Sequence, residues 1–311
     1  MSGDHHHPPP GEHAAHAHSP HRAFLIGVAL NLVFVGIEAF YGVLADSVAL
    51  LADAAHNLSD VLGLALAWAA ASLARRAPTG RRTYGLGKTT VLAALANAIL
   101  VLVAVGGLSV EAVERLLEPP PVQALTVIVV AAIGVVINTA SALLFVHDRH
   151  HDMNRRAAFV HLATDAAVSL GVVVGGLVVW RTGANWIDPA LSLLIAVVIV
   201  VGTWALLREA FDLAVDAVPA GVDAEAVATI LMAPEAVTAV HDLHIWAMST
   251  TRVALTAHLE MRLEAWTPAF AEDLERELSA LGVQHVTLQP EDAQRPCSGC
   301  APVVPGKSPS G

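Results

Sequence analysis

The sequence predicts an α-helical membrane protein with six transmembrane helices plus a C-terminal cytoplasmic α+β ferredoxin-like domain. Of its 311 residues, 55% are hydrophobic and only 14% are charged, whereas soluble globular proteins carry about 25% charged residues. Apolar runs long enough to cross a bilayer, about 20 residues each, recur along the first two thirds of the chain. After Arg208 the composition becomes mixed, over a length that suits one small domain.

Residues 1–22 precede the first apolar run and are expected to form a disordered tail. Their histidines lie among Pro, Gly and Ala, a composition typical of transient metal binding. The alternatives are an inert tail or part of an expression tag. The segment is polar, unlike a signal peptide. Its histidines are His5, His6, His7, His13, His16, His18 and His21.

The membrane domain is expected to cover residues 23–212. Only Ala45 and Asp46 separate its first two apolar runs, so these runs should form a tight helical hairpin. The expected spans are residues 23–44, 47–73, 88–113, 122–146, 157–180 and 188–211.

The orientation in the membrane follows from Lys and Arg in the short loops, because such residues are enriched on the cytoplasmic side. The loops after spans two and four are basic, whereas the opposite side has only Arg115 and Arg181. Both basic loops and both termini are therefore expected to face the cytoplasm. The basic loop residues are Arg75, Arg76, Arg81, Arg82, Lys88, Arg149, Arg155 and Arg156.

Residues 213–292 are expected to form the cytoplasmic domain, with the element order αββαβ of a ferredoxin-like fold. The strands show an alternation of period two. Residues 293–311 are rich in Pro, Gly and Ser and should form a flexible tail. The expected elements are a helix at Asp223–Met232, strands at Val237–Met248 and Arg252–Met261, a helix at Thr267–Leu281 and a strand at Val283–Gln289.

Two His-x-x-x-Asp pairs lie within apolar runs, His56 with Asp60 and His161 with Asp165. Residues four apart on a helix point the same way. Ionisable groups at membrane depth cost about 3 kcal/mol each by insertion scales, so the repeated pair indicates a shared purpose. Two imidazoles and two carboxylates suit a tetrahedral divalent metal such as zinc. The alternative is a structural network of hydrogen bonds between helices.

Other polar side chains also fall within the predicted spans. Glu38 is the most costly of them and has two open interpretations: it lines an access route or carries a proton, or it lies close enough to the outer surface to reach water. The asparagines at 31, 97 and 138 are expected to form hydrogen bonds between helices.

The soluble domain holds further metal-ligand residue types. Strict alternation puts His241 and His244 on opposite faces of their strand, with His258 on the next strand and Glu291 after the third. Cys297 and Cys300 have the spacing of half a zinc site, and the alternative for them is a mobile thiol pair.

Several classes of protein are disfavoured. A net charge of −11 argues against a nucleic-acid partner. A metallo-hydrolase needs an open metal coordination position with a nearby general base, and a sensor needs an output domain. The sequence shows no motif for these, so an enzyme is not expected.

Five motifs together resemble the cation diffusion facilitators, which are divalent-metal/proton antiporters of bacterial inner membranes and of eukaryotic membranes. The resemblance covers about residues 20–292. The motifs are HNLSD at 56–60, YGLGK at 84–88, LAALANA at 92–98, HLATD at 161–165 and VHDLHIWAMS at 240–249.

The resemblance implies a homodimer in the inner membrane that exports zinc from the cytoplasm in exchange for protons, with partners limited to lipid, zinc ions and protons. It implies a transport site of His56, Asp60, His161 and Asp165. Relatives that also accept cadmium often have Asp at position 56, so His56 favours zinc. The first alternative is a broader exporter of zinc, cadmium and cobalt. The second alternative is a membrane metallo-hydrolase.

Two more features are implied by the resemblance. Lys88 and Asp216 match a charge pair between subunits, below the membrane. His241, His258 and Glu291 match cytoplasmic ligands of vesicular zinc transporters, so zinc would be a regulatory ligand as well as the substrate. Those relatives also end in Cys-x-x-Cys, as Cys297 and Cys300 do here.

Overall fold

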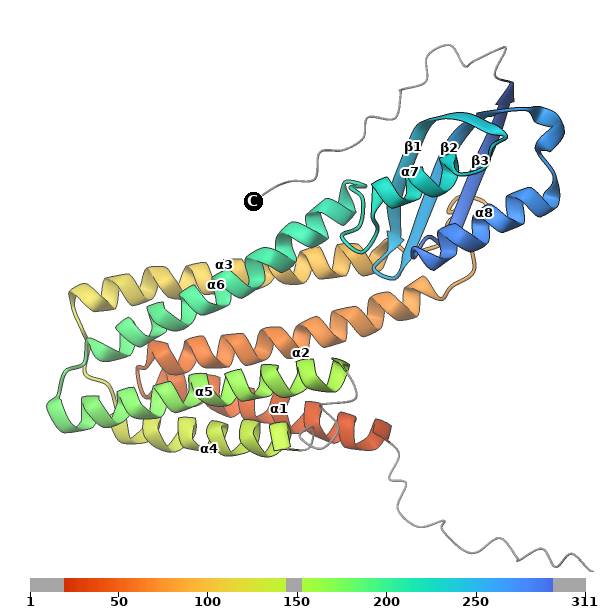
Figure 1. Cartoon of the computed structure of the whole chain (residues 1–311). Helices are drawn as coiled ribbons and strands as arrows, with labels where there is room; N and C mark the ends of the chain where they lie inside the picture. Colours follow the sequence, from red (N-terminus) through yellow and green to blue (C-terminus); the bar gives the residue numbers. More distant parts are fainter. Residues whose placement is uncertain (1–19, 144–152, 293–311) are drawn as a thin grey trace, which may run out of the picture. The chain divides into compact units, whose positions relative to one another are not determined.

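The computed structural model describes residues 20–143 and 153–292, and within them the side chains of residues 31–143 and 159–292. Six long helices precede a small α+β domain (Figure 1), as predicted. The six are α1 (Pro20–Leu44), α2 (Val48–Ala74), α3 (Thr89–Leu117), α4 (Ala124–Leu143), α5 (Met153–Thr182) and α6 (Ile187–Ala214).

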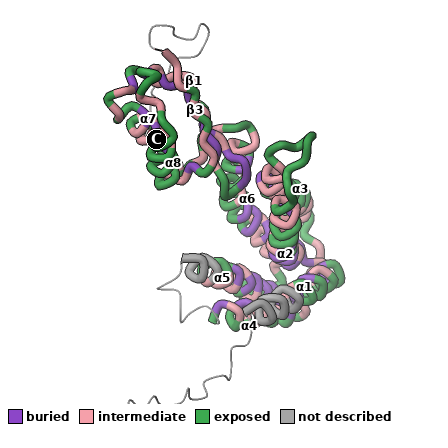
Figure 2. The backbone as a smooth tube through the Cα atoms, turned by 90° about the vertical axis from the view of Figure 1, so that its right-hand side faces the viewer, coloured by how far each residue is buried: buried purple, intermediate pink, exposed green. Residues whose placement is uncertain are grey.

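Length and hydropathy fit the predicted spans. Over their described residues, α2 to α6 are each long and apolar enough to cross a membrane, and the described part of α1, Asn31–Leu44, is a shorter apolar helix. Buried and exposed positions alternate along these helices (Figure 2). Many exposed positions carry large apolar side chains, such as Trp68, Val103 and Val201. Such exposure is expected where the surrounding solvent is lipid.

The chain forms two compact units. One contains the described residues up to Val61 together with Leu108–Ile195, and the other contains Leu62–Gly107 and the described residues from Ala196 onward. Both predicted His-x-x-x-Asp pairs fall in the first unit, and the α+β domain falls in the second.

Glycines allow close helix packing in the first unit. A Cβ on Gly175 of α5 would come within 2.0 Å of Leu191 of α6, and one on Gly176 would come within 2.9 Å of Ile128 of α4. Small residues at helix interfaces let helix backbones approach closely in membranes. These contacts fix α5, which carries one of the two His-x-x-x-Asp pairs.

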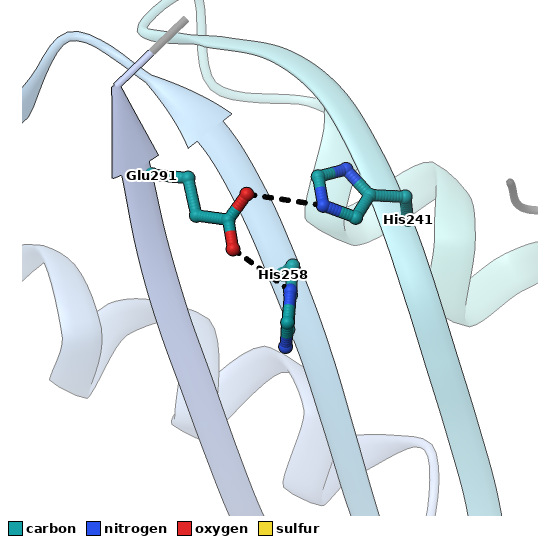
Figure 3. A group of neighbouring side chains, drawn as sticks. All are labelled: His241, His258 and Glu291. Atoms are coloured by element: carbon teal, nitrogen blue, oxygen red, sulfur yellow. Dashed lines mark ion pairs between the residues drawn. The ribbon is translucent and has the colours of Figure 1, made fainter. Parts of the chain in front are cut away.

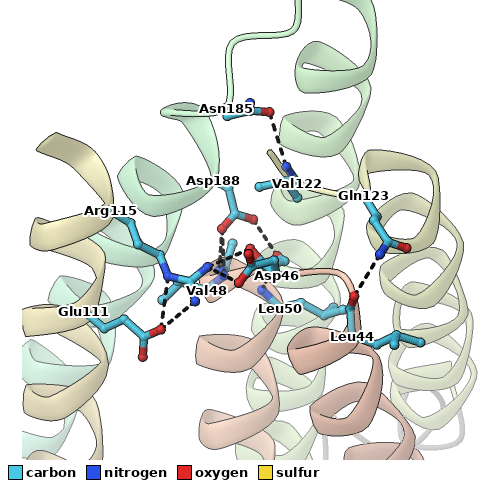
Figure 4. A network of polar contacts seen from close by, with 12 residues as sticks. Leu44, Asp46, Val48, Leu50, Glu111, Arg115, Val122, Gln123, Asn185 and Asp188 are labelled. Atoms are coloured by element: carbon cyan, nitrogen blue, oxygen red, sulfur yellow. Dashed lines mark hydrogen bonds and ion pairs between the residues drawn. The ribbon is translucent and has the colours of Figure 1, made fainter. Parts of the chain in front are cut away.

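The turn between α1 and α2 is as tight as predicted and is held by charged groups (Figure 4). Asp46 lies in this turn with a φ of 57°. Arg115 of α3 donates to the Asp46 carboxylate at 2.7 Å and to its carbonyl oxygen at 2.9 Å. Asp188 of α6 accepts from the backbone N–H of Val48 at 2.7 Å and of Ala49 at 3.3 Å. Asp188 therefore satisfies free N–H groups at the start of α2.

The α+β domain has a three-stranded sheet in the order β1-β2-β3, with β1 and β2 antiparallel and β2 and β3 parallel. Its elements are α7 (Ala224–Met232), β1 (Val237–Ser249), β2 (Arg252–Met261), a 3₁₀ turn η1 (Leu263–Ala265), α8 (Pro268–Ala280) and β3 (His285–Asp292). Asp223 and Thr267 cap the two helices with their side chains. Pro290 lies in the edge strand β3, where a missing N–H is tolerated.

One face of this sheet is covered and the other carries polar groups. Leu255, Leu259 and Met261 of β2 are buried in a core with residues of α7 and α8, such as Leu231 and Leu278. The alternate residues of β2, including His258 and Glu260, are only partly buried. The strand period therefore places His258 and Glu260 on the face away from the helices.

Candidate functional site

The two His-x-x-x-Asp pairs of α2 and α5 meet and pair crosswise. His56 Nε2 lies 3.3 Å from Asp165 Oδ1, and His161 Nε2 lies 3.2 Å from Asp60 Oδ2. Within each helix the separations are longer, 4.0 Å from His56 to Asp60 and 3.7 Å from His161 to Asp165. Each imidazole thus faces carboxylates of both helices, and the four predicted ligands form one cluster.

The spacing of this cluster suits a small tetrahedral cation. Ligand atoms at zinc–nitrogen and zinc–oxygen distances in a tetrahedron lie about 3.3–3.5 Å from one another. The four histidine–carboxylate separations run from 3.2 to 4.0 Å. The donor atoms of His56, Asp60 and Asp165 all lie within 4.8 Å of one another. This closer group leaves out His161, so zinc could be held by His56, Asp60 and Asp165, with the imidazole of His161 moving closer to complete the set.

The ligands differ in their access to solvent. The side chain of Asp165 is 4% exposed and that of His56 is 19% exposed, whereas that of His161 is 48% exposed. One end of the cluster is thus closed and the other is open at His161. A partly open cluster can exchange its cation without unfolding of the helices.

A second polar layer lies behind the ligands. Ser169 of α5 donates to the Asp53 carboxylate at 2.7 Å, and Asn57 of α2 donates to Glu38 of α1 at 3.3 Å. Glu38 and Asp53 are fully buried, and Asn57 is nearly so. Glu38 therefore does not reach the surface of the first unit, which removes one of its two predicted interpretations.

A second cluster lies on the helix-free face of the sheet (Figure 3). Glu291 lies between two histidines, with His241 Nε2 at 3.2 Å and His258 Nδ1 at 2.9 Å from its two carboxylate oxygens. His241 and His258 are direct partners across β1 and β2. Glu291 lies within β3, because this strand begins and ends later than the sequence predicts. The three predicted residues thus gather from three neighbouring strands.

The prediction for His244 is wrong because β1 contains a bulge. His241 pairs with His258 and His244 with Thr256, so three steps on β1 match two steps on β2. The bulge lies between His241 and His244, where Asp242 has a φ of 51°. His241 and His244 consequently face the same side of the sheet.

The bulge also adds carboxylates that sequence reasoning missed. The Asp242 carboxylate lies 3.2 Å from His244 Nε2 and 3.6 Å from His258 Nε2, and Glu260 lies 3.6 Å from His241 Nδ1. Asp242 and Glu260 were detectable only as acidic residues next to, or two residues from, a predicted histidine ligand. Imidazole and carboxylate donors of this kind fit zinc.

Lys88 and Asp216, the predicted charge pair, form an ion pair within one chain. Lys88 also donates to the Ala247 carbonyl oxygen at 3.0 Å, and the backbone N–H of Thr250 donates to Thr90 Oγ1 at 3.0 Å. These bonds join the start of α3 to the end of β1. The placement of the pair between two subunits remains a prediction.

The remaining predicted metal-binding groups are the two cysteines near the C-terminus and the N-terminal histidines. Cys297 and Cys300 lie outside the described residues, as do six of the seven N-terminal histidines, and the side chain of His21 is not described.

Sequence comparison matches two family models to this chain. One, the cation efflux transmembrane domain, matches residues 24–213, and the other, the cytoplasmic domain of cation efflux proteins, matches residues 219–293.

Curated relatives are similar over nearly the whole chain. The metal cation efflux system protein CzcD of Cupriavidus metallidurans is 32% identical over 91% of each chain. The zinc transporter ZitB of Escherichia coli is 31% identical over 89% of each chain. A cadmium, cobalt and zinc/H(+)-K(+) antiporter of Bacillus subtilis is 29% identical over 87% of this chain and 88% of its own.

The matched regions contain both clusters of predicted metal ligands and nearly all of the six long helices. The named relatives are transporters of metal cations and not enzymes. The protein is therefore a multi-pass membrane transporter that belongs to the cation efflux family, also known as the cation diffusion facilitators.

Proposed function

We propose that this protein exports zinc from the cytoplasm across the inner membrane in exchange for protons. The proposed transport site consists of His56, Asp60, His161 and Asp165. The observation that carries this proposal is the crosswise cluster, in which both imidazoles lie 3.2–3.3 Å from a carboxylate of the other helix. Four nitrogen and oxygen donors at this spacing match the coordination that zinc prefers.

Exchange follows from the chemistry of the ligands. Zinc binds imidazole only through a deprotonated nitrogen, and it binds ionised carboxylates, so zinc and protons compete for the same atoms. Histidine side chains titrate near pH 6.5 when unperturbed. Protons entering from a more acidic outer side would therefore help to release zinc there, and their loss to the cytoplasm would restore the site. The site would alternate between inward and outward exposure as the helices change conformation.

Zinc is preferred over cadmium because the cluster has two imidazoles. A broader substrate range is the second candidate, favoured by a relative whose name includes cadmium and cobalt as well as zinc. Replacing an imidazole by a carboxylate would move the site toward that range.

The cytoplasmic cluster is proposed as a regulatory zinc site and its domain as a dimer contact. His241, His258 and Glu291 offer three donors on a sheet face that α7 and α8 leave open. A bound zinc would reduce the negative charge of that face, where Asp242 and Glu260 also lie. Two copies of the domain could then approach with less repulsion. The predicted orientation, with this domain in the cytoplasm, is part of the same proposal.

Purified protein in sealed proteoliposomes tests the transport proposal. Zinc is added outside, and a zinc-sensitive dye and a pH-sensitive dye are trapped inside. Zinc entry accompanied by a rise in internal pH supports exchange. Zinc entry without any proton movement leaves a uniporter, and the absence of zinc movement under an imposed pH gradient excludes zinc transport. A parallel panel with cadmium and cobalt measures the substrate range.

A further inference from the structure

Glu38 and Asp53 form a carboxyl pair that the proposed metal site does not use. Glu38 lies on α1 and Asp53 on α2, and both are 0% exposed. Both belong to the first unit, as do their hydrogen-bond partners Asn57 and Ser169. The two carboxyl groups lie within hydrogen-bonding reach of each other. Buried acids within a membrane region are costly and mark ion or proton pathways.

In this pair, one oxygen of each carboxyl group accepts a hydrogen bond and the other oxygen does not. Asn57 donates to Glu38 Oε2, and Ser169 donates to Asp53 Oδ2. The other oxygens, Glu38 Oε1 and Asp53 Oδ1, are buried and receive no hydrogen bond from the described residues. Unionised carboxyl groups donate, whereas ionised ones only accept. One proton shared between these two oxygens would therefore satisfy both.

The surroundings of the pair favour a proton over a second full negative charge. Phe34, one turn before Glu38, is buried against α4, where Gly134 leaves room for its ring. One turn after Glu38, Gly42 lies against Leu51 of α2. Both carboxyl groups are fully buried, and two unpaired buried carboxylates would be strongly disfavoured.

The pair is separate from the metal ligands but is coupled to them. Among the described contacts, neither carboxyl group forms a hydrogen bond or ion pair with any of the four ligands. The charged groups that act on Asp53 are Glu38, His56 of the same helix and Asp165 of α5. The charged group that acts on Glu38 is Asp53, and the neutral amide of Asn57 donates a hydrogen bond to it. A doubly charged cation at His56 and Asp165 would therefore favour the ionised form of Asp53.

We propose that Glu38 and Asp53 form a proton-binding site that is distinct from the metal ligands and that releases its proton when zinc binds. The proton leaves the shared position between the two carboxyl groups, both of which become ionised, and the zinc charge offsets the added negative charge. The reverse occurs when zinc departs. This inference rests on the proposed exchange of zinc for protons and names a second group that carries the exchanged protons.

The first test uses the wild-type full-length protein. Infrared difference spectra between the zinc-free and zinc-bound forms should show the C=O stretch of a protonated carboxyl group that is lost when zinc binds. The band should vanish in Glu38→Gln or in Asp53→Asn. A wild-type spectrum without this band overturns the proposal, whether or not any variant folds. A band that persists unchanged in both variants overturns it as well.

The second test counts protons. The slope of log Kd for zinc against pH equals the number of protons that zinc binding displaces, and Glu38→Gln should lower this number by about one. Asn138→Ala is the matched control, because it removes a buried polar side chain of α4 that does not titrate. An unchanged slope in Glu38→Gln, or an equal loss in Asn138→Ala, contradicts the assignment.

Potassium is the competing occupant of these oxygens, and one relative is named a zinc/H(+)-K(+) antiporter. Zinc-induced release of bound rubidium, with no protonated-carboxyl band, would identify a monovalent-cation site and overturn the proton assignment. Failure of the proposed exchange gives a different result. In that case wild-type proteoliposomes would move zinc without protons, while the infrared band would still decide whether the carboxyl pair holds a proton.

Discussion

At the scale of single residues, the crosswise pairing makes each ligand dependent on the opposite helix. Asp60 lies 3.2 Å from His161 and 4.0 Å from His56, so its carboxylate contributes to the position of both imidazoles. Asp60→Asn should therefore abolish zinc flux while the protein still folds and inserts. Loss of a metal ligand should lower zinc affinity by more than about 100-fold, since changes in residues that merely support the ligands cost 10–100-fold.

Zinc uptake into proteoliposomes, normalised to inserted protein, measures the effect of Asp60→Asn. Ser59→Ala is the control, because the Ser59 hydroxyl only donates to the Ala55 carbonyl oxygen of its own helix. Near-normal flux in Asp60→Asn would remove Asp60 from the transport site. A loss as large in Ser59→Ala would point to a damaged helix.

His56→Asp tests metal selectivity at the same site. The change replaces one of two imidazoles by a third carboxylate, so the donor set becomes richer in oxygen and the pocket changes size. Cadmium flux should rise relative to zinc flux. The measurement is the ratio of the two initial rates in one vesicle preparation. An unchanged ratio would mean that His56 does not select the metal.

The sequence predicted that His56, Asp60, His161 and Asp165 gather in one cluster, because the spacing of each pair follows from helix geometry alone. It could not predict which imidazole meets which carboxylate, since that depends on the packing of α2 against α5. The sequence also did not decide whether Glu38 is buried or reaches water, because an apolar run looks the same around a buried position and around one near the end of a helix. For His244 strict strand alternation failed, since the bulge at Asp242 has no residue such as Gly to reveal it.

At the scale of elements, the start of α2 depends on a residue far away in the sequence. Asp188 accepts from two N–H groups of this helix start and from the Ser47 hydroxyl. Asp188→Ala would leave these buried donors without an acceptor, at a cost of about 1–3 kcal/mol. Thermal unfolding of detergent-solubilised protein should therefore occur at a lower temperature.

Two further variants decide whether this loss is specific to the cap. Asp188→Asn keeps one acceptor oxygen and should lose less stability than Asp188→Ala. Glu209→Gln, an exposed carboxylate of the same α6, should unfold as the wild type does. Equal unfolding temperatures for Asp188→Ala and Glu209→Gln would show that the cap contributes nothing to stability.

The sheet of the cytoplasmic domain supports a prediction of zinc binding. His241→Ala with His258→Ala removes the two imidazoles next to Glu291. Calorimetry on full-length protein carrying Asp60→Asn, which silences the membrane site, should then show one fewer class of zinc site. His285→Ala is the control, because His285 contacts Tyr84 edge to face, outside the cluster. Undiminished binding in the double variant would leave the N-terminal histidines and the Cys297/Cys300 pair to be deleted in turn.

At the scale of the whole molecule, the helix boundaries were predicted closely because long apolar runs and their polar breaks define them. The order of the helices in space was not predictable, since glycine contacts such as Gly175 with Leu191 join helices through shape and not through a sequence pattern. The strands of the α+β domain were predictable from the alternation of polar and apolar residues. The late position of β3 was not, because it depends on pairing with β2, and this position places Glu291 inside the strand.

The last prediction concerns the driving force of the whole transporter. Zinc needs the deprotonated forms of its ligands, so protonation of His56 and His161 opposes binding. Histidines titrate near pH 6.5 when unperturbed, and lowering the pH fills the competing proton sites. Apparent zinc affinity should therefore fall as the pH drops from about 7.5 to about 5.5. In proteoliposomes, zinc transport should be faster when the side to which zinc moves is the more acidic one. Zinc movement should in turn drive protons in the opposite direction. Zinc flux that ignores the gradient, together with a silent pH dye, would refute coupling.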